Sequence, residues 1–403
     1  MSIRGKVLIF IFSVLIVVGG VGLANSNFGF EGDLAEWGEY FPLQYQSFLK
    51  NGEMASTEFG GSEPVSKLDQ AVYLKELYAG MPFSVEYKED RGHVYAMDDV
   101  LDTARKKPAA SCLSCKSSDI PQLVAAEGVD FYGKPFEAGV AQIENTIGCL
   151  NCHDSDTMEL RIAQPMLIAA LEKQGRVPEQ LSNQELRTLV CAQCHVEYYF
   201  QADTKEPIYP WDKGLTVAAV EEYYDAIGFK DWTHPRSGTD LIKIQHPDYE
   251  LFQSSVHAAA GVTCADCHMP VVSDGGVTYT SHWMTSPLKH LEASCTGCHQ
   301  QDVDQLKERV LYTQRRTMEL LERAGEANIA AIDAIEAASK KRRVNQKLLA
   351  EARALHRSAQ VRFDWLAAEN SAGFHNPQES LYLLGQSIDL AWQAVEKAQL
   401  AAK

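Results

Sequence analysis

The sequence predicts a mainly α-helical protein, and three observations lead to this fold class. Apolar residues recur at helical spacing through most of the chain after Asp302, with a polar break at residues 340–343. Asn376-Pro377-Gln378-Glu379 is a helix start, with Asn as the N-cap and Pro at the first helical position. Strand signals are weak, and no internal repeat is longer than a five-residue motif. We therefore expect long C-terminal helices on an otherwise short-element fold.

The first residues form a separate segment. Arg4 and Lys6 precede an almost wholly apolar run over 7–18, and small residues lead to Ala24. This pattern is typical of an export signal over residues 1–24, and the run is short for a membrane span. A cleaved signal is favoured over an uncleaved anchor. In either case the folded part is expected outside the cytoplasm, in the periplasm.

The segments that follow are assigned from periodicity and from breakers. Residues 25 to about 66 lack a sustained period, which predicts an extended surface arm. Ser66 to Ala79 has an N-cap at Ser66 and a stop at Gly80, which predicts a helix. The remaining expectations are a turn at 90–93, a helical piece ending near Arg105, helices over 158–175 and 214–228, and loops over 229–262 and 270–294.

All ten cysteines fall into five Cys-x-x-Cys pairs. A Cys-x-x-Cys-His run is the attachment signature of c-type haem, in which both thiols form thioethers and the His binds iron. A zinc ribbon does not need that His, and a disulfide framework does not need uniform two-residue gaps. Four pairs carry the His: Cys149, Cys152 and His153; Cys191, Cys194 and His195; Cys264, Cys267 and His268; Cys295, Cys298 and His299.

The first pair departs from the rule, because Cys112-Leu113-Ser114-Cys115 is followed by Lys116. An amine binds iron only as the neutral base, so Lys116 must lose its proton through burial and the metal. That is a costly choice for a haem that only passes electrons. Lys116 is therefore predicted to ligate one iron with a different task, the alternative being a bystander beside a haem ligated elsewhere.

The histidine count supports the same division. Of twelve His, four lie in the motifs, so four bis-His haems need four more from the remaining eight. Nothing in the count has to occupy the face opposite Lys116, and an open position suits a substrate-binding haem. His290 and His356 are expected to face solvent, and His234 is assigned no role.

The chain resembles the ammonia-forming cytochrome c nitrite reductases, which are periplasmic pentahaem enzymes. The resemblance covers nearly the whole mature chain. It rests on the order of one Lys motif and four His motifs, on Cys191 to Phe200 (CAQCHVEYYF), and on Lys243-Ile244-Gln245-His246-Pro247. It implies a pentahaem catalytic region over 25–300. Residues 301–403 would be long helices of the same domain that form a homodimer interface.

The resemblance also implies roles for single residues. The distal iron ligands would be His93, His257, His282 and His375. The substrate face would carry Arg105, Tyr198 and His246. Arg91 is the weaker alternative to Arg105, because the segment from Arg105 to Lys116 is shorter than in members of the family. A calcium ion would take the side chains of Glu197 and Gln245 and the carbonyls of Tyr198 and Lys243, and such oxygen ligands suit calcium. The alternative for the last set is a Glu197–Lys243 salt bridge.

The implied reaction is the six-electron reduction of nitrite to ammonium at the Lys116 haem. The alternatives are a multihaem electron-transfer cytochrome and a related reductase of hydroxylamine or sulfite. The formal net charge of -17 argues against nucleic acid as a partner. The expected electron donor is a membrane-anchored multihaem quinol-oxidising cytochrome or a soluble cytochrome.

The five motifs predict five covalently bound haems per chain. Because each thioether pair is covalent, the intact mass of the exported protein should exceed that of the mature polypeptide by five haem masses. Mass spectrometry of the denatured protein checks this. An excess of four haem masses would mean that Cys112 and Cys115 are not an attachment site.

Overall fold

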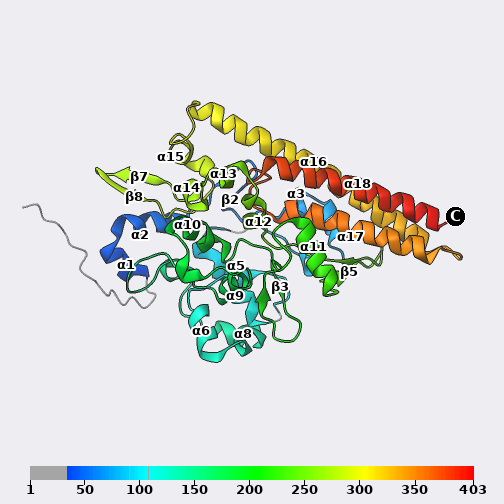
Figure 1. The fold of residues 1–403 in the computed structure, drawn as a ribbon, viewed down its shortest axis with the longest axis horizontal. Helices are drawn as coiled ribbons and strands as arrows, with labels where there is room; N and C mark the ends of the chain where they lie inside the picture. Colours follow the sequence, from blue (N-terminus) through cyan, green and yellow to red (C-terminus); the bar gives the residue numbers. More distant parts are fainter. Residues whose placement is uncertain (1–33, 90, 108) are drawn as a thin grey trace, which may run out of the picture.

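The computed structural model describes residues 34–403 except 90 and 108. In this part of the chain, helices dominate and the strands form four separate two-stranded antiparallel sheets (Figure 1). The mainly α prediction is confirmed. The strands are β1 Ser56–Thr57, β2 Gly60–Gly61, β3 Tyr199–Phe200, β4 Pro207–Ile208, β5 Trp232–Thr233, β6 Asp240–Leu241, β7 Val271–Asp274 and β8 Val277–Thr280.

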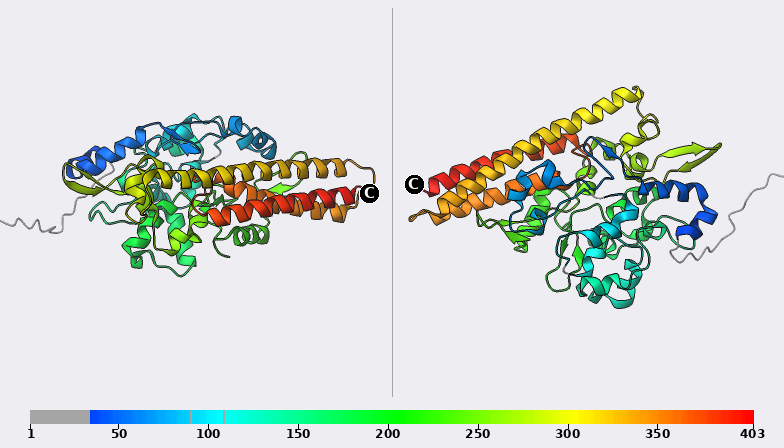
Figure 2. Two further views of the ribbon diagram at one scale, coloured as in Figure 1. Left: turned by 90° about the horizontal axis from the view of Figure 1, so that it is seen from above. Right: turned by 180° about the vertical axis from the view of Figure 1, so that it is seen from behind.

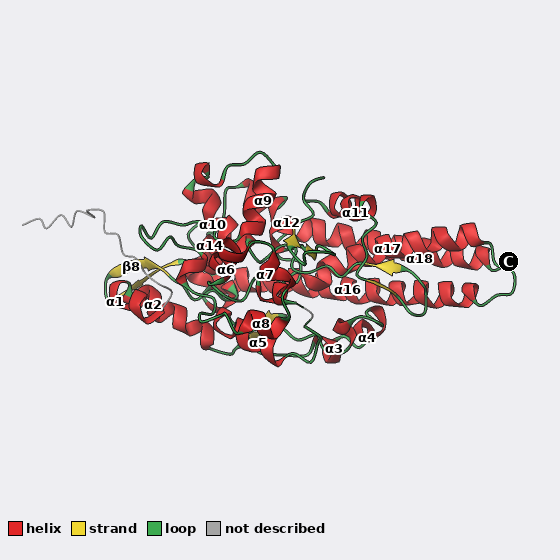
Figure 3. Ribbon diagram, turned by 90° about the horizontal axis from the view of Figure 1, so that it is seen from below, coloured by secondary structure: helices red, strands yellow, loops and turns green. Residues whose placement is uncertain are grey.

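Three long C-terminal helices pack side by side, as Figures 1 and 3 show. They are α16 (Val303–Ser339), α17 (Gln346–Ala368) and α18 (Pro377–Ala401). The chain breaks between α16 and α17 at the polar residues 340–343, as expected. The start of α18 is also confirmed, because the Asn376 side chain accepts a hydrogen bond from the backbone N–H of Glu379.

Small residues allow the three helices to approach closely. Ala331, Ala359, Ala391 and Ala394 are fully buried in one cluster between the helices. Alanine ends at Cβ, so backbones can pack at short range without a cavity. A larger cluster then joins the helices to the rest of the molecule, through residues of α4, α11, α16, α17 and α18.

The remaining residues form short helices joined by long loops, which lie along and beyond one end of the long helices (Figures 1 and 2). The helix expected over 214–228 is present as α11. In order these helices are α1 Leu34–Tyr40, α2 Pro42–Leu49, α3 Lys67–Gln70, α4 Tyr73–Leu77, α5 Ala96–Asp102, α6 Ile120–Glu127, α7 Asp130–Gly133, α8 Phe136–Val140, α9 Pro165–Lys173, α10 Asn183–Ala192, α11 Val217–Ala226, α12 Asp248–Gln253, α13 Val256–Ala259, α14 Cys264–His268 and α15 Leu291–Cys295.

Two expectations for the first part of the chain are wrong. The supposed arm contains α1 and α2, and Trp37 of α1 is buried against Leu150. A helix of seven residues has too few turns to display a period, which explains the error. The helix expected from Ser66 to Ala79 is two short helices, α3 and α4, because the backbone at Ala71 leaves the helical region.

Three further boundaries differ from expectation. The helix over 158–175 begins only at Pro165, because Met158 has a positive φ and Arg161 donates its backbone N–H to the carbonyl of Cys152. The piece expected to reach Arg105 ends at Asp102. The loop over 270–294 contains the β7–β8 hairpin.

The N-terminal expectation lies outside the described residues, since residues 1–24 are not among them. Within the described part, none of the helices is long and apolar enough to span a bilayer.

Candidate haem and active site

The five cysteine motifs lie next to one another in space. The first and third touch, because the Cys115 and Cys194 side chains are in hydrogen-bond contact. The third and fourth touch in the same way through Cys191 and Cys264. Gln193 donates to the carbonyl of Asn151 at 2.9 Å, which ties the third motif to the second. The motifs therefore form a continuous cluster.

The fifth motif joins this cluster through the fourth. The hydroxyl of Ser294 donates to the carbonyl of Cys267 at 2.7 Å. Ser294 immediately precedes Cys295 of the fifth motif, and Cys267 belongs to the fourth motif. Groups bound at successive motifs would therefore be close neighbours.

Each motif His faces a second imidazole from elsewhere in the chain. Two imidazoles on one metal lie about 6 Å apart between ring centres, because each metal–nitrogen bond is about 2 Å. The observed spacings match this, so the four pairs fit four metal centres with two imidazole ligands each. The pairs are His93 and His195 at 6.1 Å, His153 and His282 at 6.1 Å, His257 and His299 at 6.2 Å, and His268 and His375 at 6.2 Å.

Hydrogen bonds to backbone carbonyls orient three of these imidazoles. The Nδ1 atoms lie 2.8 to 2.9 Å from carbonyl oxygens, so Nδ1 carries the proton and Nε2 is left for a metal. Burial lowers the pKa values of His268 and His282 to about 4, which keeps these rings neutral, the form that binds metal. The bonds join His153 to Met158, His268 to Thr285 and His282 to Thr280.

The expectation that His290 and His356 face solvent is wrong. His356 is fully buried, with Nδ1 3.0 Å from the Thr239 hydroxyl, and burial lowers its pKa to about 3. His290 is half-buried, with Nδ1 2.8 Å from the Ser294 hydroxyl. The Thr239 partner of His356 is distant in sequence, so the local pattern did not reveal the burial of His356.

Arg105 and Arg91 have different surroundings. Arg91 forms an ion pair with Asp99 at 2.6 Å. Arg105 pairs with no carboxylate of residues 34–403 (90 and 108 excepted); its Nε donates to the Thr103 hydroxyl and its guanidinium lies 4.3 Å from the Phe83 ring centre. Its charge also acts on the Cys112 sulfur, since both are close. Arg105 therefore carries, near the first motif, a positive charge that no carboxylate of the described residues balances.

Tyr198 and His246 are brought together by a hydrogen bond between their neighbours. The backbone N–H of Gln245 donates to the Glu197 carboxylate at 2.6 Å. Because Tyr198 follows Glu197 and His246 follows Gln245, this bond holds the two segments that carry Tyr198 and His246 side by side. Tyr198 also packs in a cluster with Cys115 of the first motif. Tyr198, His246 and the first motif thus share one region of the molecule.

Three carboxylates lie at or beside the predicted calcium ligands: Glu197 and Glu250 are buried, and Asp231 is exposed. Burial raises the pKa of Glu197 well above its usual value and that of Glu250 to about 8. Within the described chain, Glu197 has no basic partner, and it accepts hydrogen bonds only from Tyr224 and Gln245. Buried carboxylates without a balancing cation fit a site for a hard divalent ion.

The carbonyl of Lys243 lies beside this cluster. It accepts a hydrogen bond from the Gln245 side-chain amide at 2.8 Å, so these two oxygen-bearing groups are adjacent. The alternative salt bridge between Glu197 and Lys243 is wrong. Lys243 Nζ instead pairs with Asp364 at 2.9 Å, and both side chains are almost fully buried.

The Lys243 ammonium lies among aromatic rings. It is 5.1 Å from the ring centres of Tyr78 and Phe83 and 5.3 Å from that of Tyr87. Such contacts favour a cation that is removed from water. Asp364 also accepts the backbone N–H of Ile244 at 2.8 Å. The Lys243–Asp364 pair thus anchors the segment that leads to Gln245 and His246.

The cysteine motifs and the four imidazole pairs together define a multihaem c-type cytochrome. A profile of the cytochrome c552 family matches residues 33–403, and the chain belongs to this family. Over 406 residues it is 40% identical to cytochrome c nitrite reductase subunit NrfA of Nitratidesulfovibrio vulgaris, covering 90% of this chain and 78% of that protein. Over 366 residues it is 40% identical to cytochrome c-552 of Bacteroides thetaiotaomicron, covering 88% of this chain and 74% of that protein.

A solved structure agrees with these relatives. The fold matches the cytochrome c nitrite reductase of Desulfovibrio desulfuricans with a TM-score of 0.88 and 38% sequence identity, over 94% of this chain and 88% of that one. That structure is described as containing two calcium sites in its catalytic subunit. The family resemblance seen in the motifs is therefore confirmed.

Sequence reasoning missed three acids that the structure places beside predicted ligands. Asp231 accepts the backbone N–H of Lys243 at 2.7 Å, and Asp364 holds the Lys243 side chain. Asp248 lies next to two of the imidazoles. A single Asp carries no periodic signal; only the position of Asp248, two residues after His246, could have drawn attention to it.

Removing the Lys243 charge should destabilise the protein strongly. Lys243→Met keeps the chain volume but leaves Asp364 buried and unbalanced, which typically costs about 3–5 kcal/mol. Lys397→Met removes one partner of the half-exposed pair with Glu351 and should cost at most about 1 kcal/mol. Chemical denaturation of both variants measures the difference. Equal stabilities would contradict the assigned role of the buried pair.

Proposed function

We propose that this protein reduces nitrite to ammonium, a six-electron reaction, at a haem ligated by Lys116. One observation carries the proposal. The four motif His residues face the four predicted distal His residues, so these pairs use all eight of those imidazoles and leave none of them for Lys116. One centre is thus left open for a ligand, and four closed centres are available to pass electrons.

Five c-type haems are the proposed cofactors. The ten motif cysteines would hold them, with Lys116 and the four imidazole pairs as axial ligands. When bound, the haems would carry electrons from the donor and would supply the iron at which nitrite is reduced. The contacts of the third motif with the first, second and fourth support electron transfer, because haems bound at these motifs would be close neighbours.

Arg105, Tyr198 and His246 are the proposed residues of the substrate face. The uncommitted guanidinium of Arg105 would bind an oxygen of the nitrite anion and stabilise the charge that develops as that oxygen leaves. Tyr198 would donate a hydrogen bond from its phenol. His246 is suited to hand protons to the bound oxygen, because imidazole gains and loses a proton near neutral pH.

Calcium is the proposed structural metal. Its ligands would be the side chains of Glu197 and Gln245 with the carbonyls of Tyr198 and Lys243. The buried carboxylates of Glu197 and Glu250 support this site, since a divalent cation would offset their charge. The ion would also fix Tyr198 and the neighbour of His246.

The family resemblance also suggests a cell compartment, an oligomeric state and an electron donor. The enzyme would act in the periplasm after export, as a homodimer joined through α16 and α18. It would receive electrons from a membrane-anchored multihaem quinol-oxidising cytochrome or from a soluble cytochrome. The exposed apolar side chains of Tyr312, Tyr382 and Trp392 on these two helices support the dimer surface.

An anaerobic assay with reduced viologen tests the function directly. Nitrite consumption should be matched by ammonium formation in equal amounts. Consumption without ammonium would overturn the six-electron reaction. Absence of consumption by a fully haem-loaded protein would leave an electron-carrier cytochrome as the better description.

Arg105→Ala should lower nitrite turnover by about a hundredfold to a thousandfold, the usual loss for one preorganised electrostatic donor. Arg91→Ala is the matched control and should lower it far less, because Arg91 is already paired with Asp99. Steady-state rates with nitrite, normalised to haem content, give the comparison. The reverse order of effects would place the substrate cation at Arg91.

Loss of calcium should lower activity while the spectrum of the bis-His haems is kept. Glu197→Ala removes a charged ligand from the site, and prolonged chelation removes the ion itself. Glu221→Gln, which alters a buried carboxylate paired with Arg362 away from this cluster, should retain the metal. Elemental analysis of the purified proteins checks occupancy. A fully active wild-type protein without calcium would rule the site out.

A further inference from the structure

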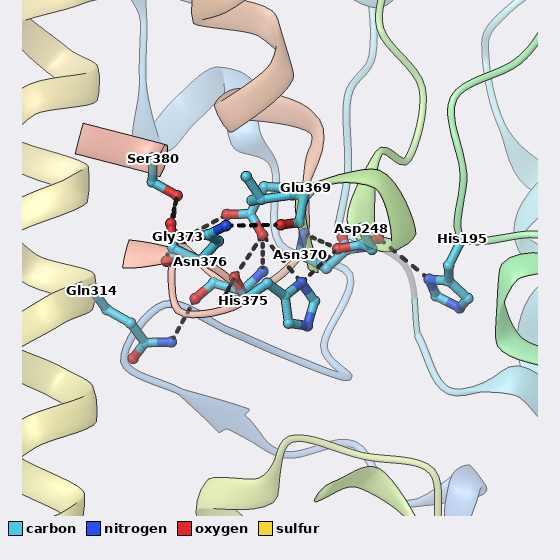
Figure 4. Close-up of polar contacts among 11 residues, drawn as sticks. His195, Asp248, Gln314, Glu369, Asn370, Gly373, His375, Asn376 and Ser380 are labelled. Carbon is cyan, nitrogen blue, oxygen red and sulfur yellow. Dashed lines mark hydrogen bonds and ion pairs between the residues drawn. The ribbon is translucent and has the colours of Figure 1, made fainter. Parts of the chain in front are cut away.

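A buried carboxylate lies between two of the four imidazole pairs. Asp248 is the first residue of α12, and Figure 4 shows it between His195 and His375. Its Oδ2 is 3.4 Å from Nδ1 of His195, and its Oδ1 is 3.3 Å from Nδ1 of His375. Its side chain is only 8% exposed. One carboxylate therefore contacts an imidazole of the third-motif pair and an imidazole of the fourth-motif pair.

Asn370 fixes the orientation of this carboxylate. Its backbone N–H donates to Oδ1 and its side-chain amide donates to Oδ2, both at 2.8 Å. The backbone N–H of Tyr249 donates to the carbonyl of His195 at 3.1 Å, so the start of α12 is also held against the third motif. Each oxygen of Asp248 thus accepts from Asn370 and faces one imidazole.

A second acid contacts only one of the two imidazoles. Glu369 Oε2 lies 3.5 Å from Nδ1 of His375, and its side chain is fully buried. The Glu369 carboxylate is held by the Ser371 hydroxyl and by backbone N–H groups of Ser371 and Gly373. His375 therefore faces two carboxylates, and His195 faces one.

Three of the other paired imidazoles have neutral partners. Nδ1 of His153, His268 and His282 each faces a backbone carbonyl. A carboxylate acceptor increases the electron density on an imidazole ligand more than a carbonyl does, and its buried charge favours the oxidised metal. Hydrogen bonding and nearby charge are levers by which proteins set haem potentials.

We propose that Asp248 is a positioning residue shared by two relay haems. It fixes the Nδ1–H form of His195 and His375, and it lowers the reduction potentials of both haems together. The inference rests on the haem ligands of the proposed function. No bond forms or breaks, and each of the two centres still gains or loses one electron.

Asp248→Asn tests the proposal, because the amide keeps the shape and removes the charge. Haem content is first verified by intact mass. Redox titration without nitrite should then show two of the four low-spin haems shifted to higher potential, with the g-values of the same two changed in electron paramagnetic resonance spectra. The haems of the His153–His282 and His257–His299 pairs should keep their potentials.

Two further variants separate tuning from a general structural effect. Glu369→Gln should raise the potential of only one of those two haems, the one with His375. Glu221→Gln, a buried carboxylate that pairs with Arg362, should shift none. A fully loaded Asp248→Asn protein with no shift, or with an equal shift in all four haems, would overturn the proposal.

Glu369→Gln keeps the test decisive if Asp248→Asn fails to assemble. A rise confined to one haem supports carboxylate tuning at His375, and no rise overturns it. Because nitrite is absent from these titrations, the result is independent of whether the protein reduces nitrite.

Discussion

Two imidazoles that share one iron must face each other about 6 Å apart between ring centres, because each metal–nitrogen bond is about 2 Å. The structure meets this requirement four times, with partners as distant in sequence as His93 and His195. Short helices, turns and loops deliver single side chains more easily than long regular elements do. The irregular region before α16 follows from this constraint, and the long helices provide the rigid support against which it packs.

Charge burial is the second feature that the site depends on. Lys243 and Asp364 lie together with almost no exposure, surrounded by the rings of Tyr78 and Phe83. Glu197 is equally buried but has no cation among the described residues. The first arrangement balances itself, whereas the proposed calcium ion would balance the second. The same segment, 243–246, joins the two arrangements and ends at a residue proposed to deliver protons.

Much of this arrangement could be predicted from the sequence. Long periodic helices and the Asn376 cap are local signals, and the cysteine motifs are covalent signatures whose spacing leaves little freedom. The short helix around Trp37 escaped detection because it has no measurable period. The burial of His356 and the contact of Asp248 with Asn370 arise between segments more than a hundred residues apart, which no local pattern encodes.

The central claim is that one haem, held by Lys116, is open to substrate and four are closed by paired imidazoles. Electron paramagnetic resonance and magnetic circular dichroism of the oxidised protein count spin states directly. One high-spin and four low-spin haems are expected, and Lys116→His should alter only the high-spin signal while all five haems remain attached. Five low-spin haems in the wild-type protein, or a Lys116→His spectrum identical to it, would contradict the claim.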